Sequence, residues 1–358
     1  MRKRILTAFT VFTGILFISA SIVWADPPAP VAKTGQTISY RTGDDGYYEK
    51  GVASPSPRFT ENGDGTITDN LTGLMWAKDA NLTGSMNWSD AIDYANNLSL
   101  GSYECGASYI DWRLPNVKEL QSLIDFGNLG PALPTGHFFS NVLSSDYWTS
   151  TTHAYDADAS AWFVNMSYSF NNEVAGADKT WVLNVWPVRG GSIESPSPVA
   201  QTGQTTSYAN GDDGDFQKGV ASSDPRFTDN EDGTVTDNLT GLMWAKDANL
   251  TSSMNWSDAI DYANNLSLGS YECGASYIDW RLPNVKELQS LIDFSNTFPA
   301  LTTGHPFSNV ISSFYWTSTT SAYDTGSAVA VLLVFGNVSS DGDKTSNLLR
   351  VWPVRGGN

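Results

Sequence analysis

Oxygen-bearing side chains that could bind a cation lie close together after residue 60. Asn62, Asp64 and Asp69 surround two glycines, and a later stretch repeats them as Asn230, Asp232 and Asp237. A hard cation such as Ca²⁺ takes six or more oxygen ligands, so these six residues are candidate calcium ligands. The full calcium-loop pattern would need a Glu at the place of Leu71. A tight Asx-type hairpin turn explains the same residues and is the more frequent use of this pattern.

Aromatic side chains form a second candidate site, in a region that differs between two otherwise similar stretches of the chain. Tyr155, Trp162, Tyr168 and Trp181 lie among Asn and Asp residues. Variable loops on a constant scaffold commonly contact ligands. We therefore expect these four residues to bind a glycan or a cell-surface protein, with drift in a permissive loop as the equally weighted alternative.

Catalytic chemistry has less support. His137 and His305 each follow a Thr-Gly pair, but no G-x-S-x-G or other nucleophile motif accompanies them. A lone histidine in a Gly/Pro loop is more often a polar loop residue than a general base. We predict no catalytic residue and no enzyme activity.

These candidate sites sit on a duplicated chain. Residues 30–191 return as residues 198–357, and between Thr66 and Phe126 the copies differ only at Ile67/Val235 and Gly84/Ser252. A unit of about 160 residues has the size of a domain and is too long for a solenoid repeat. We expect a signal peptide at 1–25, a leader at 26–57, a first domain at 58–191, a linker with a repeated leader at 192–225, and a second domain at 226–358.

The N-terminus predicts export. Arg2 to Arg4 precede an apolar run that ends in Val23-Trp24-Ala25, as in a secretory signal peptide. Removing those three basic residues would change the net charge from −18 to −21, because no acid lies before Asp26. Such a chain repels nucleic acid and anionic lipid. No later run is long enough to span a membrane, so we expect a protein of the periplasm, cell surface or extracellular space.

Each copy contains one cysteine, Cys105 or Cys273. Neither can form a disulfide within its own domain. They could pair with each other in an oxidising compartment, or remain two buried thiols.

Each copy reads as strands, two helices and strands again. Asn-, Asp- and Gly-rich turns separate β-branched runs at 58–60, 66–69 and 74–77, which is typical of a β-meander. Asn87 and Asn116 are placed to cap two helices, the second with Glu119 in a capping box. Further strands are expected at 147–151, 161–164 and 182–189. This order predicts an α+β fold, with the tryptophans of these elements in its core.

Five sequence words in this order resemble the Lcl C-terminal domain family, long catalogued as a domain of unknown function and named after a bacterial collagen-like adhesin. In the first copy they are DGTITDNLTGLMWAKD at 64–79, NWSDAIDYANNL at 87–98, DWRLPNVKELQSLID at 111–125, YWTSTT at 147–152 and VWPVRGG at 185–191. The second copy repeats all five. The resemblance implies a C-type-lectin-like fold, related to the formylglycine-generating sulfatase modifiers, in two tandem copies.

The resemblance also implies an exported, non-catalytic module for binding or adhesion. The sulfatase modifiers act through a late cysteine pair, which neither copy contains. The eponymous adhesin is thought to bind sulfated glycosaminoglycans through a basic surface, and the acidity of this chain argues against that ligand. A structural or assembly subunit of the envelope is the alternative, and an uncharacterised hydrolase a third.

Overall fold

The computed structural model describes residues 26–102, 108–167, 173–191, 193–270 and 276–357. The expected signal peptide, Cys105, Cys273 and Tyr168 lie outside these ranges. The first half contains α1 (Asp45–Tyr48), β1 (Phe59–Glu61), β2 (Thr66–Asp69), β3 (Leu74–Ala77), α2 (Trp88–Asn96), α3 (Val117–Ser122), β4 (Asp146–Thr152), β5 (Ser160–Asn165), β6 (Val174–Asp178) and β7 (Val188–Gly190). The second half contains α4 (Asp213–Phe216), β8 (Phe227–Asp229), β9 (Thr234–Asp237), β10 (Met243–Ala245), α5 (Trp256–Asn264), α6 (Val285–Ser290), β11 (Phe314–Thr320), β12 (Ser327–Leu332), β13 (Asn337–Asp343) and β14 (Val354–Arg355).

The predicted α+β class is confirmed, with two tandem β-rich domains and three antiparallel sheets. One four-stranded sheet per copy has the order β1-β2-β3-β7 or β14-β10-β9-β8. In the first copy Ile67 of β2 lies opposite Trp76 of β3, and β7 returns to pair with β3. The last strand of each copy therefore closes the sheet that the predicted meander begins.

Both helix starts follow the predicted capping chemistry. The Asn87 side chain accepts from the Asp90 amide. Asn116 and Glu119 form a complete capping box at the start of α3. α3 ends at Ser122, and beyond it the chain turns away, so that the Asp125 amide donates to the Ala132 carbonyl.

The tryptophans predicted to be core residues are buried. Trp76 and Trp186 meet edge to face with ring centroids 5.6 Å apart. Trp112 is buried beside Arg113, whose guanidinium donates to both carboxylate oxygens of Glu119 at 2.5 and 2.6 Å. Glu119 also accepts from the Asn116 amide at 2.9 Å. The DWRLPN word therefore combines a core ring, a buried ion pair and a helix cap.

The third sheet continues across both copies, in the order β11-β12-β13-β6-β5-β4. Its two halves join where Val338 of β13 lies opposite Val174 of β6. The region that differs between the copies, residues 153–184 in the first, holds two strands of this sheet: β5, which contains the strand expected at 161–164, and β6. β6 was not predicted, because its sequence VAGAD lacks the aromatic and large β-branched run typical of strands.

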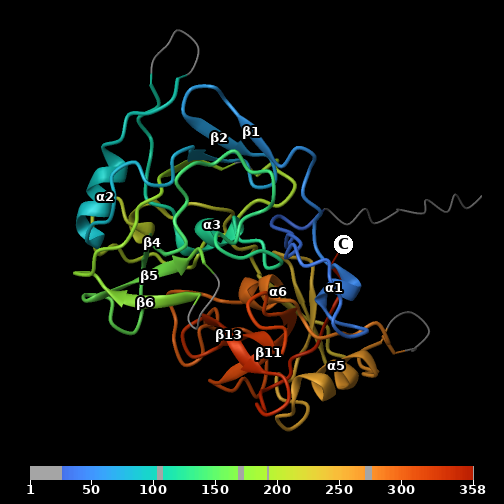
Figure 1. The fold of residues 1–358 in the computed structure, drawn as a ribbon. Coiled ribbons are helices and arrows are strands. Elements are labelled where there is room, and N and C mark those ends of the chain that lie inside the picture. The colour runs from blue at the N-terminus through green and yellow to red at the C-terminus, as the bar shows by residue number, and fades with distance from the viewer. Residues whose placement is uncertain (1–25, 103–107, 168–172, 192, 271–275, 358) are drawn as a thin grey trace, which may run out of the picture.

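Each leader docks on the other copy, not on the copy that it precedes in the sequence. Figure 1 shows α1, from the first leader, beside α5 and α6 of the second copy. Tyr48 of α1 donates to Asn264 of α5 at 3.2 Å, and the buried Asp45 accepts from Thr319 of β11 at 2.7 Å. The second leader docks on the first copy in the same way, where Asp213 of α4 accepts from Thr151 of β4 at 2.7 Å. Each domain is therefore covered by a segment that precedes the other one.

A glutamine from each leader covers an edge of the six-stranded sheet. Gln36 donates to the Thr320 carbonyl and accepts from the Thr320 amide, both at 2.9 Å. Gln204 binds the amide and carbonyl of Thr152 in the same manner. Since β11 and β4 are the outer strands, these contacts satisfy backbone groups that an open sheet edge would expose.

The helices of the described residues are all too short or too polar to cross a membrane.

Candidate functional site

Three aromatic rings meet where the two copies join, and we call them the seam aromatic cluster: Tyr155, Phe298 and Phe335. The Tyr155 ring lies 5.9 Å from Phe298 and 5.5 Å from Phe335, and the last two are 5.2 Å apart. Tyr155 is 66% exposed and Phe298 56% exposed. Tyr155 follows β4 of the first copy, while both phenylalanines belong to the second. The cluster therefore exists only because the two copies are held together.

Phe298 has an unusual backbone. Its φ is +56°, in the left-handed region that a bulky residue rarely adopts. The equivalent residue of the first copy is Gly130, with φ +48°. The second copy has thus replaced a glycine by a large apolar residue that is half in solvent. Such a strained position is a reason to suspect function. The glycine-to-phenylalanine difference between positions 130 and 298 is the sequence signal that marks this site.

The half-buried His153 and the buried rings of Trp162 and Phe294 pack beneath the exposed cluster. His153 stacks on Trp162 at 4.7 Å and lies 5.1 Å from Phe335. Trp162 meets Phe294 of the second copy edge to face at 5.1 Å. Burial lowers the pKa of His153, with an opposing contribution from Asp156. The neutral imidazole therefore acts as a spacer between the core and the exposed rings.

The sequence suggested Trp162 as a ligand contact, but its side chain is only 1% exposed and cannot contact a ligand directly. The reason is that it lies on β5, an interior strand of the six-stranded sheet, opposite Gly176 of β6. A Cβ at Gly176 would lie 2.7 Å from His153, so the glycine leaves room for this stack. Trp162 supports the cluster rather than belonging to it.

Of the other two expected aromatic contacts, Tyr168 lies outside the described residues. Trp181 is 58% exposed on the turn after β6, where its amide donates to the Asp178 carbonyl at 2.9 Å. Among the described ring contacts, none joins Trp181 to the seam aromatic cluster.

The candidate calcium ligands take part in turns. Asp64 accepts from the amide and hydroxyl of Thr66 and from the Ser102 amide, which lower its pKa against the opposing effect of burial. Asn62 donates to Thr66 and Thr68. The buried Asp69 accepts from Arg58, the Leu71 amide and Thr72. Asn230, Asp232 and Asp237 repeat this arrangement. Within the described ranges, no group of three acidic, His or Cys side chains is placed to hold a metal.

The two matching histidines are half-buried. Burial lowers the pKa of His137 and of His305, and the Nδ1 of each is enclosed without a hydrogen-bond partner. Each ring packs beside a phenylalanine, Phe139 or Phe307, at 5.8 or 5.7 Å. A general base would need a carboxylate at Nδ1 to orient it. The described surroundings of these imidazoles are those of packed loop residues.

Comparison with known proteins agrees with the repeated fold. The family model described as the Lcl C-terminal domain matches residues 65–189 and again residues 233–355. These ranges begin one residue before β2 or β9 and end in β7 or β14, so they leave out both leaders and the first strands, β1 and β8. No match was found among curated proteins or among solved structures. The chain belongs to the Lcl C-terminal domain family, an adhesin-like family, and carries two tandem copies of its domain.

Proposed function

We propose that this protein is an exported, non-catalytic adhesion module that holds an uncharged glycan on the seam aromatic cluster. The observation that carries the proposal is the pair of exposed rings of Tyr155 and Phe298, which lie on turns of different copies and pack against each other. Aromatic faces bury apolar sugar faces with little loss of side-chain entropy, since the rings are already packed against one another.

The surroundings of the cluster favour a sugar over a charged ligand. Asp156 and Asp158 are exposed beside Tyr155 and can accept hydrogen bonds from sugar hydroxyls. The net charge of −18 would repel a sulfated chain. A glycan on this cluster would contact residues of both copies at once.

A glycan array probed with the mature protein tests the proposal. Removing a central aromatic contact costs about 2 kcal/mol, or roughly thirtyfold in Kd. Tyr155→Ala and Phe298→Gly should each produce that loss, and the glycine at position 130 indicates that the backbone accepts the second change. Trp181→Ala, an exposed ring outside the cluster, is the matched control and should retain binding. Retention of a surface protein but of no glycan would mean that the cluster recognises protein instead.

The exchanged leaders favour a second candidate, an envelope assembly subunit. The first leader docks on a domain that is nearly identical to its own, so the same contacts could form between two molecules. Light scattering at increasing protein concentration would distinguish the two functions. A monomer that binds glycan supports the adhesion module, while a growing polymer with no soluble ligand supports assembly.

A further inference from the structure

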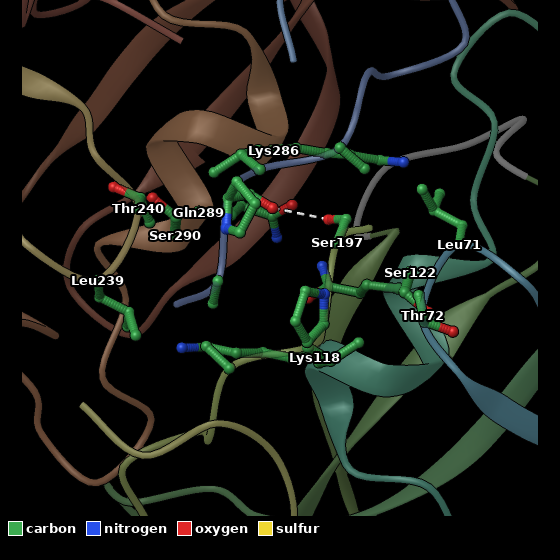
Figure 2. Close-up of a pocket in the computed structure, with 18 residues that line it drawn as sticks. Leu71, Thr72, Lys118, Ser122, Ser197, Leu239, Thr240, Lys286, Gln289 and Ser290 are labelled. Carbon is green, nitrogen blue, oxygen red and sulfur yellow. Dashed lines mark hydrogen bonds between the residues drawn. The ribbon is translucent and has the colours of Figure 1, made fainter. Parts of the chain in front are cut away.

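A cavity of about 120 Å³ lies between the two copies, where the leaders cross between α3 and α6. Equivalent residues of the two copies line it, so it has approximate twofold symmetry. Residues 30–32 of the first leader and 198–200 of the second contribute apolar groups to its lining, and Figure 2 shows the side chains around it. A cavity of about 150 Å³ accommodates benzene, so this one can enclose the short aliphatic part of a ligand.

A lysine extends along each side of the cavity. Lys118 from α3 reaches toward the second copy, where its Nζ donates to the Gln201 carbonyl at 3.0 Å and lies 5.9 Å from the Phe294 ring. Lys286 from α6 reaches the opposite way, donating to the Lys33 carbonyl at 3.1 Å. Figure 2 shows the two side chains running in opposite directions, so that their ammonium groups lie toward opposite ends of the cavity.

Both ammonium groups have unused hydrogen-bonding capacity. An ammonium has three N–H donors, and each of these two makes one described hydrogen bond and no described ion pair. Burial lowers the pKa of both Lys118 and Lys286 to about 7, although nearby carboxylates such as Asp293 and Asp125 oppose that shift. A half-buried cation without an ion-pair partner is costly, and an anion beside it would offset that cost.

Two glutamines of the cavity wall also have unused hydrogen-bond donors. Gln121 and Gln289 occupy equivalent places, and the side-chain nitrogen of each is enclosed without a hydrogen-bond partner. Gln289 is buried. Unpaired donors at a cavity favour a ligand that brings acceptor oxygens, because an unsatisfied buried amide otherwise costs about 1–3 kcal/mol.

From this geometry we infer that the cavity binds a short aliphatic dicarboxylate, with one carboxylate toward Lys118, the other toward Lys286, and the methylene chain against the apolar residues of the two leaders. A monocarboxylate could satisfy only one end. A compact dianion such as sulfate could not span both ends and would leave the apolar walls unfilled.

Isothermal titration calorimetry of the full mature protein at pH 7 tests the inference, with succinate, glutarate, adipate and pimelate as probes and butyrate and sulfate for comparison. We expect one dicarboxylate length to bind at least tenfold more tightly than butyrate or sulfate. At pH 8 we also expect proton uptake on binding, seen as a dependence of the enthalpy on the buffer, because the carboxylates would restore the ammonium form. Both results come from the unaltered protein and need no variant to fold.

Variants then assign the two ends. Lys118→Met and Lys286→Met should each reduce dicarboxylate affinity at least tenfold and remove its advantage over butyrate. Lys78→Met, which removes a lysine far from the cavity that pairs with Glu61, should change neither. The inference is wrong if no dicarboxylate binds at millimolar concentration, if sulfate or butyrate binds as tightly as the best dicarboxylate, or if both cavity variants bind as the unaltered protein does.

Discussion

The buried carboxyl groups that anchor the leaders should make the protein less stable as the pH rises. Asp45 is 3% exposed and accepts from Thr34 at 2.8 Å and from Thr319 at 2.7 Å. Burial raises its pKa from 3.8 to about 7, and the two threonine hydrogen bonds only partly oppose that shift. Asp213 has the equivalent place in the other leader, and burial raises its pKa to about 6.

The sign follows from proton linkage. Between pH 3.8 and about 7, the folded protein retains the Asp45 proton that the unfolded chain has already lost. The contribution of this group to stability is therefore complete below pH 3.8 and is lost as the pH rises through about 7. At roughly 1.4 kcal/mol per pKa unit, the loss is at most about 4 kcal/mol.

Asp45→Asn tests this reasoning. The amide oxygen of asparagine can still accept from the threonines, but it has no charge to bury. We expect the variant to match the unaltered protein at pH 4 and to exceed its free energy of unfolding at pH 8 by up to about 4 kcal/mol. Urea unfolding at several pH values measures the difference, with the exposed Asp158→Asn as control. A variant that is less stable at pH 8 would refute the argument, because it would mean that the ionised carboxylate is stabilised where it lies.

Three further changes have defined outcomes. Gln36→Ala leaves the amide and carbonyl of the buried Thr320 without partners. It should lower the free energy of unfolding by about 2–4 kcal/mol in urea titrations. An unchanged midpoint would show that the first leader does not dock as described. Arg113→Met leaves the Glu119 charge buried and uncompensated, so we expect a loss of about 3–5 kcal/mol in the same assay, and a loss below 1 kcal/mol would contradict it. Phe298→Gly relieves the strain of a left-handed backbone, which costs about 1–2 kcal/mol, and removes a half-exposed ring. The melting temperature should therefore hold or rise. A large fall would show that this ring belongs to the core.

The sequence predicted what depends on local chemistry. Asn87 and Asn116 cap helices because a short polar side chain can satisfy the first free amides, wherever the helix packs. Trp76 and Trp186 are buried because large rings on periodic strands dominate the core.

The sequence could not predict which of the two copies each leader contacts. The surfaces that receive the leaders, such as YWTSTT at 147–152 and again at 315–320, are identical in sequence, so nothing local tells a leader which one to choose. The burial of Trp162 also depends on a contact between the copies, because Phe294 of the second copy packs edge to face against its ring.

The most direct test of the adhesion proposal is glycan binding by the mature protein and by Phe298→Gly, measured with and without calcium. We expect the mature protein to retain an uncharged glycan in both conditions, and the variant to lose about thirtyfold in affinity while remaining folded. Equal binding by the two proteins would contradict the role of the seam aromatic cluster, and so would binding that depends on added calcium.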